Sequence, residues 1–313
     1  YRIKKIYRGG ELDADVYSPL AQPGLNVREG DYILAVNGKA IDTAKDPWAA
    51  FQGLSGDAVI LTVNSAPDMK NAREITVKVI TSSDEQKLRY LDWVSQNREK
   101  VNKVTEGKVG YVYVPDTGTN GQNELVRQFT PQTSKEAIIV DERFNAGGQV
   151  PDRFIELLNR PVLNYWAVRE FKDQKTPSVS NNGPKVMIIN GWSGSGGDAF
   201  PYYFRKTGLG PLVGTRTLGG LIGISGNPRF VDGGYITAPG YAFWNSNGKW
   251  DVEGHGVDPD YKVEDLPANL NDSSDPQLDK AIEVIMDMLK NHPPEQPVRP
   301  QYEDRSGGRM IDP

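Results

Sequence analysis

Two serines lie in a turn of small residues between an apolar, strand-like run and a helix-like run. The segment reads Asn190-Gly-Trp-Ser-Gly-Ser-Gly-Gly-Asp-Ala-Phe200 and contains Ser193 and Ser195. A serine at a sharp strand-to-helix turn is presented outward, and the next amide lies at the positive helix end, where it can stabilise an oxyanion. Neither serine fits G-x-S-x-G, but flanking glycines favour Ser195 as a nucleophile. The same residues are also typical of a capped helix start or a phosphate-binding turn.

Two further loops contain residues that could assist such a serine. Asp141-Glu-Arg-Phe-Asn-Ala-Gly-Gly148 ends in paired glycines, whose N–H groups can point at one oxyanion, although the pattern alone is more typical of a tight turn. Asp251–Asp260 brings Glu253 and His255 close together. His255 could act as the base for Ser195, although a loop histidine between glycines is more often structural. One histidine among scattered carboxylates does not indicate a metal site.

The composition excludes several classes of function. Across 313 residues there are only two histidines, His255 and His292, and no cysteine, so thiol catalysis, disulfides and thiolate metal sites are excluded. The formal charge of −5 gives no basic footprint for nucleic acid. No apolar run approaches the ~18 residues of a membrane span, and no motif indicates a cofactor. The chain opens at Tyr1 without a leader, so we expect a mature product or a piece of a longer protein, and leave its compartment, cytoplasmic or exported, open.

The first 82 residues read as a small β-rich module. Strand-like runs cover residues 31–36, 58–63 and 74–80, and Asn37-Gly38 is a strong hairpin signal. Between them, Asp46 and Pro47 are typical of the start of a short helix that runs to Phe51.

From Ser82 onward the pattern changes to alternating strands and helices. Ser82 and Glu85 match a capping box that opens a helix of roughly 15–20 residues. Three strand-like runs are each followed by a helix-like run: 109–114 by 122–129, 137–141 by 151–158, and 186–190 by 198–206. Two hairpin-like turns follow near 232–234 and 245–248. A last helix, capped by Asp275, is expected at 276–290. This order predicts an α/β fold with a largely parallel sheet, and the loops after Val114, Asp141 and Asn190 should meet at one edge. The proline-rich tail, 291–313, should be extended.

Together the motifs resemble a known family. The order D-x-R-x-N-x-G-G (141–148), N-x-x-x-G-S-x-G-D (190–198), G-T-R-T-x-G-G (214–220) and G-V-D-P-D (256–260) resembles the tricorn protease branch of the tail-specific (C-terminal processing) serine proteases, over about residues 1–290. The resemblance implies a PDZ-like domain at 1–82. It also implies a protease domain with a crotonase/ClpP-like α/β fold at 83–290, before the tail at 291–313.

The resemblance also implies roles for single residues. Ser195 stands where the family has its nucleophile, and the N–H of Gly196 would form the oxyanion hole with that of Gly147, our first choice, or Gly148. Glu253 matches the glutamate of the tricorn catalytic tetrad. In that branch the histidine base and an adjacent serine precede the PDZ-like domain, in a segment missing here.

The two alternative bases fit the resemblance poorly. His255 matches a position that the family does not use as the base. The C-terminal processing proteases use a lysine in a T-x-G-K motif, but this chain has Gly220 in its place, and glycine cannot accept a proton.

The predicted function is therefore that of a serine peptidase that hydrolyses peptides through an acyl-enzyme at Ser195. The chain alone should be inactive without its base, and the complete enzyme should be a homo-oligomer. The alternative is an inert peptide-binding fragment or pseudo-enzyme. A crotonase-like acyl-transfer enzyme is the weakest reading. The PDZ-like domain could bind peptide ends at a sheet edge or act as a spacer.

Overall fold

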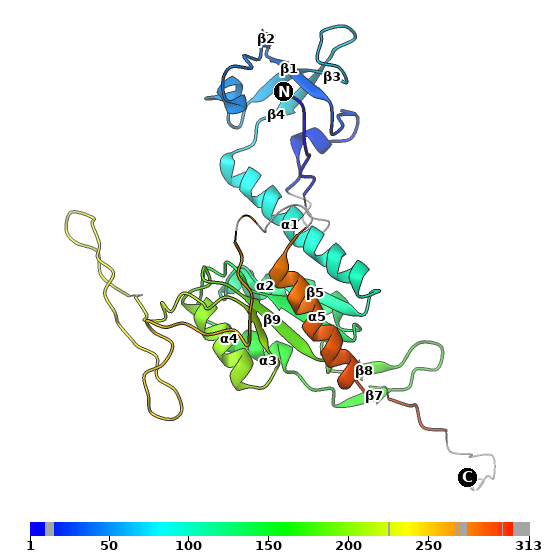
Figure 1. Cartoon of the computed structure of the whole chain (residues 1–313), viewed down its shortest axis with the longest axis vertical. Coiled ribbons are helices and arrows are strands. Elements are labelled where there is room, and N and C mark those ends of the chain that lie inside the picture. The colour runs from blue at the N-terminus through cyan, green and yellow to red at the C-terminus, as the bar shows by residue number, and fades with distance from the viewer. Residues whose placement is uncertain (10–15, 225, 267, 269–273, 296, 303–313) are drawn as a thin grey trace, which may run out of the picture. The chain divides into compact units, whose positions relative to one another are not determined.

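The computed structural model describes residues 1–9, 16–224, 226–266, 268, 274–295 and 297–302 (Figure 1). The chain forms two compact units, Tyr1–Glu99 and Lys100–Pro313. The division falls inside helix α1 (Ser82–Val104), whereas we expect the boundary between the domains after the first residue of this helix.

The first unit contains a four-stranded sheet in the order β2-β1-β3-β4, with all neighbours antiparallel. Its strands are β1 (Tyr32–Val36), β2 (Lys39–Ala40), β3 (Ala58–Asn64) and β4 (Arg73–Lys78), and its short helices are η1 (Pro19–Ala21) and η2 (Pro47–Phe51). Asn37 and Gly38 have φ values of 49° and 73°, which confirms the predicted hairpin turn. The Asp46 side chain accepts a hydrogen bond from Trp48 N at 2.8 Å, so the predicted cap of η2 is also confirmed.

Helix α1 starts with a different capping pair from the one predicted. Thr81 Oγ1 accepts a hydrogen bond from Asp84 N at 3.1 Å, and Asp84 Oδ2 accepts one from Thr81 N at 3.2 Å. The Thr81 hydroxyl also donates to Asp84 Oδ2 at 2.7 Å, and this bond, followed by the one from Thr81 N, holds the pKa of Asp84 below its ordinary value. The predicted box of Ser82 and Glu85 was wrong by one residue, because Thr81 and Asp84 have the same spacing and matching chemistry. The helix, with 23 residues, is also longer than expected.

The second unit is built on a five-stranded sheet in the order β11-β10-β9-β6-β5. Its strands are β5 (Val109–Tyr113), β6 (Ala137–Asp141), β9 (Lys185–Ile189), β10 (Leu212–Gly214) and β11 (Tyr261–Lys262), and its helices are α2 (Thr119–Phe129), η3 (Thr130–Gln132), α3 (Pro151–Leu158), α4 (Gly196–Lys206) and α5 (Pro276–Asn291). All neighbouring strands are parallel, which confirms the predicted α/β architecture. The sequence pattern missed β10 and β11, which are too short to show a periodicity.

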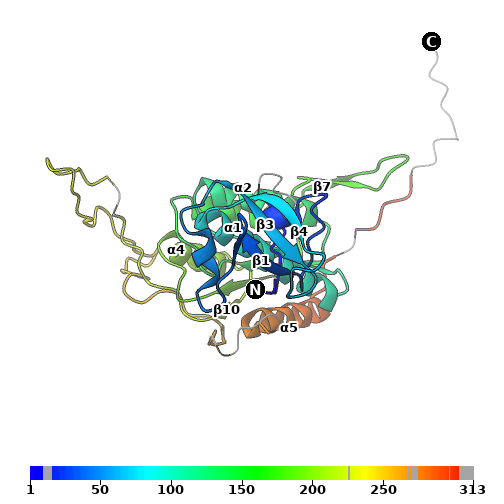
Figure 2. The same cartoon turned by 90° about the horizontal axis from the view of Figure 1, so that it is seen from above.

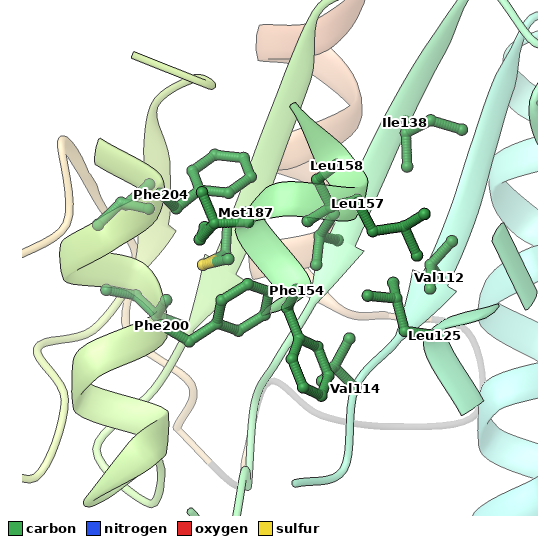
Figure 3. Close-up of a cluster of buried hydrophobic side chains, with 14 of the residues drawn as sticks. Val112, Val114, Leu125, Ile138, Phe154, Leu157, Leu158, Met187, Phe200 and Phe204 are labelled. Carbon is green, nitrogen blue, oxygen red and sulfur yellow. The ribbon is translucent and has the colours of Figure 1, made fainter. Parts of the chain in front are cut away.

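Helices cover both faces of this sheet. Figure 2 shows α5 on one side and α2 and α4 on the other. The side chains of α2, α3 and α4 meet those of β5, β6 and β9 in one buried cluster (Figure 3), where the rings of Phe154 and Phe200 pack edge to face with centroids 5.4 Å apart. On the other face, α5 contacts β6, β9 and β10. Asp275 caps α5 as predicted, accepting a hydrogen bond from Leu278 N at 3.1 Å.

Two segments extend from the second unit (Figure 1). One is an unpredicted hairpin of β7 (Asn164–Trp166) and β8 (Gln174–Thr176). The other, residues 226–250, makes the two predicted turns: Phe230 N donates to Gly234 O at 2.8 Å, and Asn245 N donates to Lys249 O at 2.8 Å. In the tail, Arg299 forms an ion pair with Asp173, and residues 296 and 303–313 lie outside the described residues. No described helix combines the length and apolar character needed to cross a membrane.

The buried cluster makes a direct prediction about stability. Phe154 is fully buried, so Phe154→Ala should lower the free energy of unfolding by about 3–5 kcal/mol in urea denaturation. Phe171→Ala is the matched control because this ring is 75% exposed, and it should change stability by less than about 0.5 kcal/mol. Equal effects of the two substitutions would contradict this packing.

Candidate active site

Three loops that follow parallel strands come together at glycines. A Cβ atom at Gly147 would lie 2.9 Å from Ser195 Cβ, and one at Gly148 would lie 2.2 Å from Gly118 N. A Cβ atom at Gly196 would lie only 1.9 Å from Thr117 Oγ1. The loops after β5, β6 and β9 therefore approach more closely than any side chain would allow, and their predicted meeting at one sheet edge is confirmed.

Ser195 is the outward-facing serine of the turn before α4. It is exposed, and its backbone has φ 57° and ψ −115°, a conformation that residues other than glycine rarely adopt. Ser193, by contrast, is fully buried, and its hydroxyl donates to Glu142 O at 2.8 Å. Of the two serines that the sequence offered as nucleophiles, only Ser195 is presented to solvent.

A buried carboxylate joins this turn to a neighbouring loop. Asp198 Oδ2 accepts hydrogen bonds from Ser195 N at 2.8 Å and Gly220 N at 3.0 Å. Its Oδ1 accepts from Thr217 Oγ1 at 2.5 Å and from Gly219 N at 2.8 Å. Four donors thus satisfy one fully buried carboxylate. Sequence reasoning missed this role of Asp198, although its place three residues after Ser195 is the spacing of a capping box.

The backbone N–H groups near Ser195 differ in whether they already donate a hydrogen bond. Gly147 N already donates to Asn145 Oδ1 at 2.9 Å, and Asn145 Nδ2 in turn donates to Val114 O at 3.2 Å. Gly148 N and Gly196 N donate no hydrogen bond to any described residue. The Asn145 side chain thus occupies the N–H group of Gly147, our first choice, whereas that of Gly148, our second choice, has no acceptor among the described residues.

The Glu253 side chain bonds to residues 221 and 222, which directly follow the loop residues that Asp198 binds. Glu253 Oε2 accepts hydrogen bonds from Leu221 N and Ile222 N, both at 2.6 Å. The next residue, Gly254, donates from its N–H to Gly219 O at 2.8 Å. Among the described residues, the hydrogen-bond partners of the Glu253 side chain are these amides and not Ser195. Ser195 and Glu253 are therefore joined indirectly, through residues 217–222.

The two histidines have other contacts. His255 is exposed, and its Nε2 lies 2.9 Å from Asp258 Oδ2 while its Nδ1 lies 3.5 Å from Arg216 Nη1. Neither ring nitrogen has a hydrogen bond to Ser195 within the described chain. His292 follows the last residue of α5 and caps it through its backbone. Across residues that the structure describes, no three His, Asp or Glu side chains gather as a metal site.

Charged side chains are buried directly after β6. Arg143 Nη2 lies 2.7 Å from Asp141 Oδ2 and 2.8 Å from Asp275 Oδ2, which links this loop to the cap of α5. Burial opposes the charge of Arg143, but the two carboxylates outweigh it and raise the pKa of Arg143. The Glu142 carboxyl is also fully buried and accepts no hydrogen bond from the described residues. Burial, and then the nearby charges of Asp198 and Asp141, raise the pKa of Glu142 well above its ordinary value.

Two family models match parts of this chain. Residues 108–263 match the family model of Peptidase family S41, and residues 1–82 match that of the Tricorn protease PDZ domain. The chain is 37% identical over 297 residues to Tricorn protease homolog 1 of Streptomyces coelicolor, covering 95% of this chain and 28% of that protein. It is 33% identical over 300 residues to the Tricorn protease of Thermoplasma acidophilum, covering 96% of this chain and 28% of that one.

A solved structure is similar as well. The crystal structure of the tricorn protease superposes with a TM-score of 0.84 at 32% identity, over 92% of this chain and 28% of that one. The chain thus spans about 28% of the length of these relatives.

The buried Glu142 carboxyl predicts a pH dependence of stability. A folded-state pKa above the ordinary 4.5 means that, as pH rises past 4.5, the unfolded chain loses this proton while the folded chain keeps it. The wild type should therefore lose about 1.4 kcal/mol per pH unit relative to Glu142→Gln, up to the folded-state pKa. Urea denaturation from pH 4 to pH 8 should show a gap that opens with pH.

The matched control for this experiment is Glu156→Gln, which removes an exposed carboxylate of α3. Its difference from wild type should stay below about 0.5 kcal/mol at every pH. A constant gap between Glu142→Gln and wild type across the pH range would contradict a protonated Glu142.

Proposed function

The chain belongs to the tricorn branch of peptidase family S41, and from this premise we propose that it carries the nucleophile of a serine peptidase. Peptides would be hydrolysed through an acyl-enzyme at Ser195. One observation carries the proposal: Ser195 is exposed in a strained turn at the start of α4, beside the N–H groups of Gly148 and Gly196, which have no acceptor in the described part of the chain.

The chemistry follows from the groups around this turn. Ser195 Oγ attacks the carbonyl carbon of a peptide bond while a base takes the hydroxyl proton. The carbonyl oxygen becomes negative and accepts hydrogen bonds from Gly148 N and Gly196 N, with the positive end of α4 adding to its stabilisation. The base then protonates the leaving amine, and water hydrolyses the ester to release the carboxylic acid. Asp198 acts through the backbone: it holds Ser195 N and fixes the turn.

We propose that the base comes from outside residues 1–313. His255 is engaged by Asp258 and Arg216, and His292 caps α5. In the tricorn branch, the resemblance places a histidine base in a segment before the PDZ-like domain. Glu253 would orient that histidine through Oε1, since Oε2 is taken by two backbone amides.

The organisation of the chain follows from the same proposal. Residues 1–82 form the PDZ-like domain, 83–290 the protease domain and 291–313 the tail. Peptides are the substrates, and the complete enzyme is a homo-oligomer.

A second candidate function is that of an inert peptide-binding fragment or pseudo-enzyme. One observation favours it: neither ring nitrogen of His255 bonds to Ser195 in the described structure.

Removing the proposed nucleophile gives the first test. In the protein that includes the upstream segment, Ser195→Ala should lower peptide turnover by at least ~10⁴-fold. Ser193→Ala is the matched control, because this hydroxyl is buried and bonds to Glu142 O, and it should keep at least about a tenth of the turnover. Full activity in Ser195→Ala, or a comparable loss in both variants, would contradict the assignment.

The source of the base is a separate question, and fluorophosphonate labelling answers it. The protein extended upstream of Tyr1 should react at least ~100-fold faster than residues 1–313, because only an activated serine attacks the reagent quickly. Equally fast labelling of residues 1–313 would place the base within them. Slow labelling of both proteins would support the pseudo-enzyme.

A further inference from the structure

A cavity of about 530 Å³ lies at the carboxyl ends of β9, β10 and β11. It shares no lining residue with the cavity that contains Ser195. Its walls continue the parallel strands: Thr215 N donates to Ile189 O at 3.1 Å, and Val263 N donates to Gly214 O at 2.9 Å. The cavity is thus a separate site built on the sheet, and the proposed peptidase chemistry does not use it.

Five charged side chains line this cavity, and four of them form ion pairs. Arg216 Nε lies 2.6 Å from Asp258 Oδ1, and Lys262 Nζ lies 2.8 Å from Glu264 Oε1. The fifth, the half-buried Asp265, forms no ion pair with a cation of the described residues. The lining therefore has one negative charge in excess, at the Asp265 carboxylate.

The cavity also contains an aromatic surface without a partner. Trp192 is 75% exposed, and no ring or cation of the described residues packs on its indole. The face of an indole ring is the negative end of its quadrupole and attracts cations. A carboxylate and a ring face in one cavity both favour a positively charged ligand.

One buried side chain holds the indole and the carboxylate in place. Asn190 is fully buried, and its Oδ1 accepts hydrogen bonds from Trp192 N at 3.2 Å and from Phe144 N at 3.0 Å. Its Nδ2 lies 3.4 Å from Asp265 Oδ2. Asp265 Oδ1 accepts no hydrogen bond within the described part of the chain, so the carboxylate keeps room for further donors.

We propose that this cavity binds an arginine side chain of a peptide. The planar guanidinium would stack on the Trp192 indole and donate N–H groups to the Asp265 carboxylate. A lysine ammonium could pair with Asp265, but it has no planar face to stack on the ring. A carboxylate would meet the excess negative charge, and an apolar side chain would displace water from charged groups without replacing it. The inference does not rest on the proposed peptidase function, because binding needs no reaction at Ser195.

Peptide binding in the absence of hydrolysis tests this site. Acetyl-Ala-Ala-X-Ala-Ala-amide peptides, with X as Arg, Lys, citrulline or Glu, are titrated by calorimetry into the chain carrying Ser195→Ala. Citrulline has the shape of arginine without its charge. The Arg peptide should bind at least about tenfold more tightly than the citrulline and Glu peptides, and at least about threefold more tightly than the Lys peptide. Equal affinities for Arg and citrulline, tighter binding of Lys, or no binding of the Arg peptide would overturn the proposal.

Removing the charge of Asp265 shows whether the arginine binds there. Asp265→Asn keeps an oxygen for Asn190 Nδ2, and it should lower the affinity for the Arg peptide at least about tenfold while leaving that for the citrulline peptide unchanged. The matched control is Asp287→Asn, which makes the same change on an exposed residue of α5 outside the cavity and should alter neither affinity. An unchanged affinity for the Arg peptide in Asp265→Asn would overturn the proposal.

Removing the ring tests the stacking. Because Trp192 is 75% exposed, Trp192→Ala should fold normally, as circular dichroism can check, and it should abolish the preference for Arg over Lys. Trp250→Ala is the matched control, since this ring is 77% exposed and lies outside the cavity, and it should keep the preference. A preference for Arg that survives in Trp192→Ala would overturn the proposal.

Discussion

The arrangement around Ser195 depends on the hydrogen bonds that the Asp198 carboxylate accepts. A buried charge is costly unless hydrogen bonds replace its water, and here four donors do so. Because these donors come from both the Ser195 turn and residues 217–220, satisfying the one carboxylate fixes two loops together. The loop then continues to Leu221 and Ile222, whose amides bind Glu253. The hydrogen bonds of Asp198 thus hold the Ser195 turn and residues 217–220 together, and the same loop then binds Glu253.

The parallel sheet supplies the frame within which Asp198 acts. Its strands end side by side, so the loops after β5, β6 and β9 must meet, and only glycines at positions 147, 148 and 196 allow them to approach so closely. Where these loops meet, the amides of Gly148, in the loop after β6, and Gly196, at the start of α4, have no acceptor among the described residues. On the other side of the loop after β6, Arg143 bridges Asp141 and Asp275, which anchors that loop to α5.

Much of the fold and part of the site could be predicted from the sequence where local patterns are strong. Apolar runs identified β6 and β9, and Asp46 and Asp275 were found as caps because their side chains act within a few residues. The hydrogen bond of Gly147 N could not be predicted, since it depends on where the Asn145 side chain points. Four short strands could not be predicted, because two or three residues are too few to show a periodic pattern: β7, β8, β10 and β11. The role of Asp198 could not be predicted either, because its hydrogen-bond partners lie up to 22 residues away in the sequence.

The most direct test of the account is to find which residue carries the acyl group during turnover. The protein extended upstream of Tyr1 is quenched with acid while it hydrolyses a peptide ester, and its proteolytic fragments are analysed by mass spectrometry. We expect the fragment containing Ser195 to gain the mass of the acyl group and the modification to map to the Ser195 hydroxyl. Steady turnover with the acyl group on another residue, or with no covalent intermediate at all, would contradict it.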